Sequence, residues 1–598
     1  MLTIPRYLAA GMIAVAVLTV VVAASCSSTP AQVTPSPTQA TMVTPPRPTV
    51  TAPLPSPTAT PTPAAKQTAS TIASFAGQPL VSFLSAHFTG SGDCALCHSQ
   101  LVDRAGNDVS IDAHWRSTMM ANSANDPLWQ AKVSSEVARA PLLEAEIEDK
   151  CATCHMPMAR TEAAASGEPA SIFNDGLHSA EHPLHAFAMD GVSCSLCHQI
   201  QDVSLGEKES FEGHYTIDVR ATPPDRAIYG PFPRPYANPM RMNVGFTPIE
   251  GPHTLDSGLC GTCHTLYTPY VDAGGNVLGT FPEQMPYLEW EQSAYGGENG
   301  RGRSCQQCHM PAAESAAVIS NRPPGGPLAA RSPFARHFFV GGNTFMLDLF
   351  RVHGEQLGLT AGTAHLEATL ARTVERLSTT TAALSIVSAR TDGNTVTVIL
   401  ETASAAGHKF PTGFPSRRAW LHVTLHDAAG RIVFESGQPQ ADGSIAGNDA
   451  DQDAARYEPH YDRISSPDQV QIYEPIMRNS DGQITYTLLR AASYAKDNRL
   501  LPFGFDKTMA SEDVRVRGAA AEDETFVGGS DQIGYQVDVG EHKGPFTVRA
   551  ELLYQSLSYQ FAQDLCSQDL PQSKTICDHY RATDHIPALV ASVERRIR

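Results

Sequence analysis

The stretch Cys94-Ala95-Leu96-Cys97-His98 contains two cysteines three positions apart, with a histidine directly after the second one. The same Cys-x-x-Cys-His pattern occurs four more times in the 598-residue chain. The further copies are Cys151/Cys154/His155, Cys194/Cys197/His198, Cys260/Cys263/His264 and Cys305/Cys308/His309. The composition of the chain would produce about 0.01 such motifs by chance. Ten of the thirteen cysteines therefore belong to one repeated motif.

The spacing of these motifs suits the covalent attachment of haem. Two thiols three positions apart can add to both vinyl groups of one haem, and the adjacent histidine can then bind the iron. Zinc ribbons and thioredoxin-like redox pairs also contain Cys-x-x-Cys, but neither requires a histidine after every second cysteine. The sequence therefore predicts five covalently bound c-type haems. The predicted proximal iron ligands are His98, His155, His198, His264 and His309.

Other histidines or methionines must supply the second axial ligands, because five irons have ten axial positions. His253, just before the fourth motif, and His337, shortly after the fifth, are the favoured candidates. For the second and third haems, the candidates are His182 or His185, which lie between the two motifs. In the first segment, His114 and Met120 compete for one site.

Several segments around the motifs resemble a known family. They are Trp115–Ala121, Asp190–Cys194, Tyr287–Trp290, Cys308–Pro311 and His337–Asn343. Over roughly residues 90–345, the chain resembles the multihaem c-type cytochromes related to the tetrahaem cytochrome of ammonia oxidisers. Those proteins often have a histidine where Met120 stands here. The resemblance implies a haem-packed domain with short helices, few strands and closely stacked haem pairs.

The N-terminus has the features of an export signal. Arg6 precedes the apolar run Leu8–Ala24, and small residues lead to Cys26. This pattern is typical of bacterial lipoproteins, in which that cysteine carries the lipid; an uncleaved signal anchor with an incidental cysteine is the alternative. We therefore expect a signal peptide over residues 1–25 and a Pro/Thr-rich disordered tether over 26–75. The protein would then lie outside the cytoplasm, in the periplasm or at the cell surface, anchored to the membrane by its lipid.

The character of the sequence changes after the last motif. We expect a pentahaem domain over 76–345, a helical connector over 346–381 and a β-sandwich-like domain over 382–598, which together make an α+β fold. Within the connector, residues 361–380 have the apolar spacing of an amphipathic helix. The apolar face is expected to contain Leu366, Leu370, Val374 and Leu377.

The last domain alternates apolar and polar residues around Gly-containing turns, as antiparallel strands do. The expected strands are 385–390 and 395–401, 420–426 and 432–434, and segments near 534–539 and 546–557. Cys566 and Cys577 enclose a short loop and can form a disulfide in an oxidising compartment.

The segment Gly407–Arg418 is unusually rich in Pro, Gly and cations for a loop of a sandwich. Arg417 and Arg418 could pair with haem propionates. His408 or His460 could bind an iron. The alternative is a rigid loop with surface charges.

The net charge of −19 argues against nucleic acid as a partner. We favour an electron relay between redox donor and acceptor proteins, or from a membrane quinol-oxidising complex, with no catalytic residue assigned. An oxidoreductase acting on a small nitrogen or sulfur compound at one open haem is the alternative. The sequence lacks a Cys-x-x-Cys-Lys variant, which favours the relay. Haem storage or a filament subunit is a third class.

Overall fold

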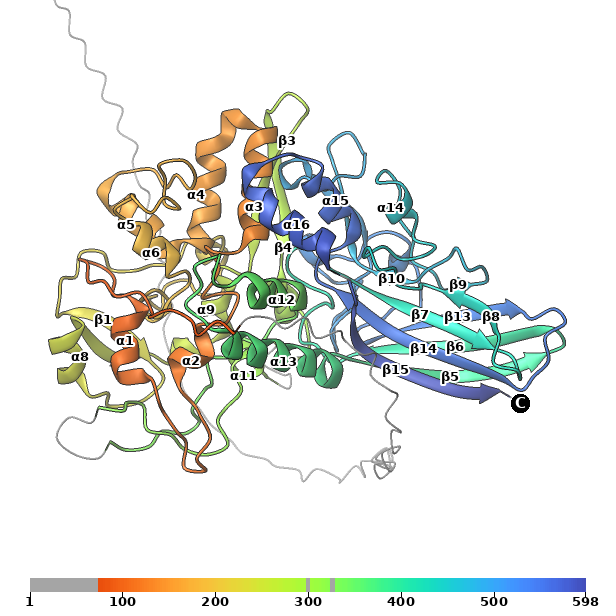
Figure 1. Cartoon of the computed structure of the whole chain (residues 1–598), viewed down its shortest axis with the longest axis horizontal. Helices are drawn as coiled ribbons and strands as arrows, with labels where there is room; N and C mark the ends of the chain where they lie inside the picture. Colours follow the sequence, from red (N-terminus) through yellow and green to blue (C-terminus); the bar gives the residue numbers. More distant parts are fainter. Residues whose placement is uncertain (1–73, 297–301, 323–327, 584, 598) are drawn as a thin grey trace, which may run out of the picture. The chain divides into compact units, whose positions relative to one another are not determined.

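The computed structural model describes residues 74–296, 302–322, 328–583 and 585–597 (Figure 1). The predicted signal peptide, Cys26 and all but the end of the predicted tether lie outside these residues. The described residues belong to one compact unit. A division of this unit into domains at 345 and 381 stays a prediction. In the part of the chain that is described, no helix is both long and apolar enough to cross a bilayer.

Each Cys-x-x-Cys-His motif lies on or at the end of a short helix. These helices are α1 (Ser91–His98), α4 (Glu144–His155), α7 (Cys194–Cys197), α9 (Ser257–Gly261) and α11 (Cys305–His309). In a helix, residues three and four positions apart share one face, so both cysteines and the histidine point the same way. The helical conformation therefore prepares each motif to hold one planar group.

Further helices and two small strand pairs connect the motifs. The helices are α2 (Ile111–Trp115), α3 (Pro127–Arg139), α5 (Pro157–Ser166), α6 (His185–Met189), α8 (Ala237–Asn243) and α10 (Pro286–Glu291). The strands are β1 (Arg226–Gly230) with β2 (Phe246–Glu250), which are parallel, and β3 (Leu266–Val271) with β4 (Val277–Gln284), which are antiparallel. Short helices and few strands are what the family resemblance implied. We call residues 74–380 the helical region.

Two longer helices, α12 (Thr344–His353) and α13 (Thr363–Thr380), close the helical region. The predicted helix over 361–380 is confirmed, and its predicted apolar face is confirmed at Leu366 and Leu377 but not at Leu370 and Val374. Val374 is 45% exposed, and the buried face contains Leu366, Thr369, Thr373 and Leu377. The threonines can be buried because their hydroxyls are bonded: Thr369 contacts a serine hydroxyl at 2.7 Å, and Thr373 donates to the Thr369 carbonyl at 2.9 Å.

Residues 382–597, the β region, contain mostly strands. They are β5 (Ala382–Asp392), β6 (Thr395–Ser404), β7 (Arg418–His426), β8 (Ile432–Ser436), β9 (Arg463–Ile464), β10 (Ile472–Tyr473), β11 (Pro475–Arg478), β12 (Ser493–Asp497), β13 (Ser530–Asp538), β14 (Phe546–Gln555) and β15 (Ala588–Ile597). The predicted hairpins β5–β6 and β7–β8 are confirmed as antiparallel pairs. The predicted strands near 534–539 and 546–557 correspond to β13 and β14.

Two sheets of the β region share one hydrophobic core. One has the order β10-β7-β14-β15 with β8 beside β7, and the other has the order β5-β6-β13-β9. Their long strands run side by side in the right half of Figure 1. Val398, Leu421 and Val548, from both sheets, belong to the same buried cluster. This mixture of helices and largely antiparallel sheets is an α+β fold, as expected.

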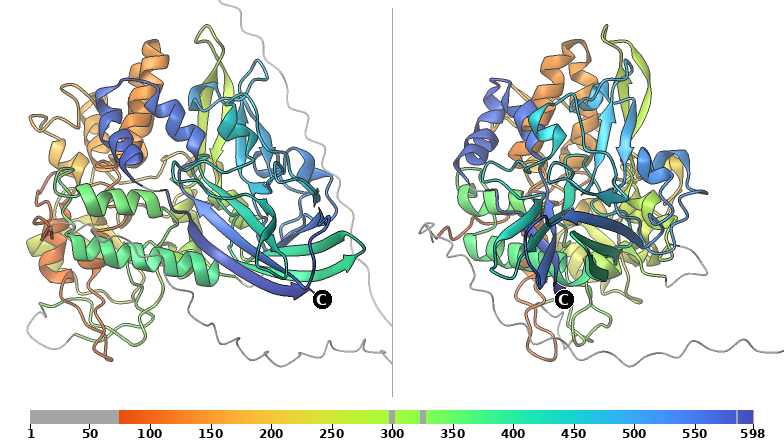
Figure 2. Two further views of the ribbon diagram at one scale, coloured as in Figure 1. Left: turned by 45° about the vertical axis from the view of Figure 1, so that its right-hand side comes forward. Right: turned by 90° about the vertical axis from the view of Figure 1, so that its right-hand side faces the viewer.

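The β region also contains helices, which the sequence did not predict. α14 (Asp449–Gln452) lies between β8 and β9, and α15 (Tyr559–Cys566) and α16 (Lys574–Ala582) lie between β14 and β15. The predicted disulfide Cys566–Cys577 is confirmed and joins α15 to α16. Both helices lie beside α3 in Figures 1 and 2, and Leu565 and Ile576 share a buried cluster with Ala131. The two regions are therefore packed together rather than merely linked.

Candidate haem-binding cavity

The cysteines and histidines of all five motifs line one cavity of about 1520 Å³. The ten motif cysteines are half-buried and form no disulfide. The loop between β6 and β7 contributes part of the cavity wall, including His408, Thr412 and Arg417. Since the cavity receives every motif side chain, it can hold the groups that the motifs attach.

Four of the five motif histidines have the same orientation. The Nδ1 atoms of His98, His155, His198 and His309 contact the backbone carbonyls of Ile319 (2.7 Å), Ser123 (3.1 Å), Tyr229 (2.6 Å) and Val340 (2.5 Å). A carbonyl can only accept, so each Nδ1 carries the hydrogen and each Nε2 keeps its lone pair. A hydrogen bond from Nδ1 to a backbone carbonyl is the usual support of a histidine that binds metal through Nε2.

Burial keeps these imidazoles neutral. It lowers the pKa of His155 to about 4 and that of His309 to about 4, and it also lowers the pKa of His98, His198 and His264. A neutral imidazole is the form that binds iron. The five motif histidines thus have the protonation state that the prediction requires.

The motifs are neighbours in space, in an order that differs from the sequence. Thiols of different motifs lie close enough for one to raise the pKa of the other in three pairs: Cys194 acts on Cys94, Cys263 on Cys154 and Cys305 on Cys260. Cys263 also lies near enough to Cys197 to raise the pKa of that thiol, after the larger effect of burial. The first motif therefore adjoins the third, and the fourth adjoins the second, third and fifth.

His337, a predicted iron ligand, lines the cavity opposite the third motif. Its ring centroid is 6.4 Å from that of His198, with 33° between the ring planes. A metal–imidazole bond is about 2 Å long, so two imidazoles that share one metal ion have ring centroids about 6 Å apart. Burial, followed by the nearby His198, lowers the pKa of His337 to about 3. The pair therefore fits the two axial positions of one iron.

The other predicted second ligands have different surroundings. His253 is buried, and its Nε2 contacts the Ile200 carbonyl at 3.0 Å. His182 Nδ1 accepts the Leu184 N–H, and His185 Nδ1 contacts a backbone carbonyl at 3.2 Å. These three histidines are absent from the described lining of the cavity. Their roles as ligands stay predictions.

In the first segment, the two competing candidates differ in position. Met120 lines the cavity. His114 is buried 3.8 Å from an Asp108 oxygen, with its ring 4.3 Å from that of Phe338. Burial lowers the pKa of His114 to about 4 in spite of this carboxylate. Of the two, Met120 is therefore the one that faces the cavity.

The two arginines predicted to contact haem propionates also differ. Arg417 lines the cavity and donates to the Thr412 carbonyl. Arg418 is 1% exposed, forms an ion pair with Asp451 at 2.9 Å and donates to Gln555 at 2.9 Å. Arg417 is thus placed to reach a propionate, whereas the guanidinium of Arg418 is paired within the β region.

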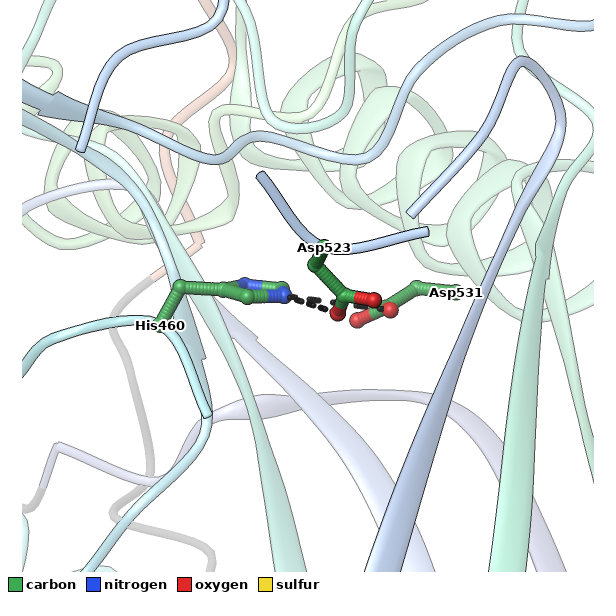
Figure 3. A group of neighbouring side chains, drawn as sticks. All are labelled: His460, Asp523 and Asp531. Carbon is green, nitrogen blue, oxygen red and sulfur yellow. Dashed lines mark hydrogen bonds and ion pairs between the residues drawn. The ribbon is translucent and has the colours of Figure 1, made fainter. Parts of the chain in front are cut away.

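A second group of possible metal ligands lies in the core of the β region (Figure 3). It contains His460, Asp523 and Asp531, and His460 Nε2 is 3.0 Å from Asp523 Oδ2. His460 Nδ1 accepts amide hydrogen bonds from Gln471 (2.8 Å) and Asn498 (3.0 Å). The oxygens of both amides accept backbone N–H groups, which fixes the orientation of the amides.

These contacts identify the cluster as a hydrogen-bonded part of the core. Because His460 Nδ1 only accepts, Nε2 carries the hydrogen and donates it to Asp523, so it has no lone pair for a cation. Burial raises the pKa of Asp531 to about 7, which allows that carboxyl to hold a proton at neutral pH. His460, considered above as an iron ligand, is thus engaged away from the cavity.

The chain was compared with known protein families, curated proteins and solved structures. No protein-family model matches the chain, and neither does any curated protein. A solved structure that resembles it is a penta-heme cytochrome c552 from Thermochromatium tepidum. The two share 16% sequence identity with a TM-score of 0.44, and the match covers 81% of this chain and 96% of that chain. The interpretation of the cavity therefore rests on its own side chains.

Proposed function

We propose that this chain is an extracytoplasmic pentahaem c-type cytochrome that relays electrons. The observation that carries the proposal is the convergence of all five motifs on one cavity, with four motif histidines turned by backbone carbonyls so that Nε2 is free. Ten cysteines without disulfides in one cavity also suit thioether attachment better than separate zinc sites, each of which needs its own closed set of four ligands.

The residues of the cavity have distinct roles in this proposal. The cysteines hold the haems, the motif histidines bind the irons from one side, and Arg417 pairs with a propionate. Bound haem would supply reversible one-electron transfer between ferrous and ferric iron. The apolar residues around the motifs, such as Leu196 and Val340, exclude water from the attached groups.

The spatial order of the motifs supports a relay. Because the first motif adjoins the third, and the fourth adjoins the second, third and fifth, every attached haem would have a neighbouring haem. An electron could then enter at one end and leave at another without a free intermediate. The proposed partners are redox donor and acceptor proteins or a membrane quinol-oxidising complex, with lipid on Cys26 holding the chain at the membrane.

The haem content of the full chain tests the proposal. The protein should be produced in a host that attaches c-type haems, and a pyridine haemochrome assay with intact mass should give five haems. A Cys305→Ala/Cys308→Ala variant should carry four, whereas Cys566→Ala/Cys577→Ala should still carry five. Zinc in place of haem, or fewer than five haems in the unaltered chain, would overturn the proposal. Five haems with a high-spin signal that binds carbon monoxide would instead favour the oxidoreductase alternative.

A further inference from the structure

We propose that His408, in the loop between β6 and β7, is the second axial ligand of the iron attached at Cys305 and Cys308. This inference rests on the proposed function, since it requires a haem at the fifth motif. It assigns a cofactor-binding role to the β region, which contains no Cys-x-x-Cys-His motif. The β region would then complete a haem site of the helical region.

The first argument is the geometry of two rings. The ring centroids of His309 and His408 are 6.2 Å apart, and the ring planes differ by 13°. Two imidazoles that share one metal ion have centroids about 6 Å apart, because each metal–nitrogen bond is about 2 Å long. The pair His198–His337 has nearly the same separation, 6.4 Å. The helical region supplies both rings of that pair, whereas His408 comes from the β region.

The second argument is the orientation of His408. Its Nδ1 contacts the Lys409 carbonyl at 2.9 Å, so Nδ1 carries the hydrogen and Nε2 keeps its lone pair. His309 is held in the same way by the Val340 carbonyl. Both histidines also line the cavity. A half-buried imidazole with a free Nε2 facing a motif histidine is prepared to bind iron.

The third argument is that buried charges fix the loop that carries His408. Glu289 of α10 accepts the Lys409 N–H at 3.2 Å and the Thr412 hydroxyl at 2.5 Å. It also forms an ion pair with Arg499 at 2.8 Å. The Lys409 ammonium, fully buried, pairs with Asp497 at 2.7 Å. The residue next to His408 is thus anchored at its backbone and at its side chain.

These anchors connect the two regions at the point where His408 enters the cavity. Glu289 belongs to the helical region and follows the fourth motif, whereas Asp497 and Arg499 belong to the β region. Arg499 also donates to both oxygens of Asp497, at 2.8 Å each. Burial alone would raise the pKa of Asp497, but Arg499 and Lys409 hold it well below its usual range. The network therefore stays charged and keeps the loop in place.

A His408→Ala variant of the full-length haem protein tests the inference. We expect five haems by pyridine haemochrome, with one of the five converted from low spin to high spin in the electron paramagnetic resonance and visible spectra. Added imidazole should restore the low-spin state. His426→Ala, which removes a histidine of β7 beyond the cavity, is the matched control and should leave the spectra unchanged.

His408→Met keeps the test decisive if the alanine variant fails to assemble. This variant offers a thioether in the same place, so a near-infrared band of His/Met ligation should replace one of His/His ligation. Five haems with unchanged low-spin spectra in His408→Ala, or no His/Met band in His408→Met, would overturn the assignment. Failure of the proposed function would be distinguishable, because the unaltered chain would then contain fewer than five haems.

Discussion

The five motifs of the helical region line a cavity of about 1520 Å³, to which the β6–β7 loop adds part of the wall, whereas the two sheets of the β region pack against each other. Val398, Leu421 and Val548 are almost fully buried within the shared core of the sheets. The core of the sheets is thus filled by its own side chains, whereas the cavity has room for the haems that we propose. If haem is attached there, the helical region depends on it as core material, and the β region does not.

A chain produced without haem attachment should show this contrast most strongly. Without haem, the apolar walls of the cavity would be exposed to water instead of being covered by the attached groups. We expect rapid proteolysis within residues 74–380 and retained β-type circular dichroism from residues 382–597. Mass spectrometry of the fragments, with the haem-loaded chain as the control, provides the measurement. Equal resistance of both regions without haem would contradict the contrast.

The junction between the regions can be tested through Glu289, which is fully buried. Glu289→Ala removes a carboxylate from Arg499 and an acceptor from the Lys409 amide, and losing one partner of a buried ion pair costs about 3–5 kcal/mol. Denaturant unfolding of the haem-loaded chain should show this loss. Glu291→Ala, at an exposed position of the same helix, should change the free energy of unfolding by less than about 0.5 kcal/mol. Similar effects of both variants would show that the junction contributes little.

The sequence predicted the β region better than the cavity, for physical reasons. A strand pattern such as β5–β6 is local, since alternation and the turn at Gly393 lie within a short segment. The motifs are equally local, because attachment needs only neighbouring cysteines and a histidine. The pairing of His309 with His408 depends instead on how distant segments pack. The His-Lys-Phe-Pro segment is unusual in the sequence, but nothing in the sequence identifies the motif that His408 faces.

The buried face of α13 shows a second limit of prediction from the sequence. Hydrophobic periodicity selected Leu370 and Val374, whereas the structure buries Thr369 and Thr373. Periodicity counts apolar residues and cannot anticipate that a buried hydroxyl finds a partner. The sequence does not predict α15 and α16 for a related reason, because the buried face of each helix is short.

The disulfide in the β region is expected to have a moderate effect. Cys566 and Cys577 are 11 residues apart, and a loop of this size corresponds to about 2–3 kcal/mol in the chain-entropy model. Cys566→Ala/Cys577→Ala should lower the free energy of unfolding by that amount while the spectra of the haems stay unchanged. Chemical denaturation monitored at both the haem bands and the far ultraviolet would measure it. A change in the haem spectra would mean that α15 and α16 also position the cavity.

The smallest expected effect concerns pH and the surface of the β region. His422 lies 3.0 Å from Glu435 and 3.1 Å from Glu551. Burial alone would lower its pKa, but the two carboxylates raise it above the usual value. Its contribution to stability is therefore complete below an unfolded pKa of about 6.5 and is lost as the pH rises through the folded value.

The His422→Gln variant should lose the stabilisation that the charged imidazole provides. The Tm of this variant should therefore fall less than the Tm of the unaltered chain between about pH 6 and about pH 9. His426→Gln, at the end of the same strand, is the control and should keep the original dependence. An identical pH dependence in His422→Gln would show that the two carboxylates do not stabilise the charged imidazole.

The position of His408 in the chain has a consequence for biogenesis. All five attachment motifs precede the β6–β7 loop in the sequence, and that loop forms part of the cavity wall. Chains are made and exported from the N-terminus, and their domains fold in the same order. If the motifs attach haem as proposed, each motif can therefore receive its macrocycle before the β6–β7 loop forms the last part of the cavity wall. The β6–β7 loop, which is synthesised later, would then complete the cavity wall around the attached haems. The order of synthesis would thus set the order of assembly.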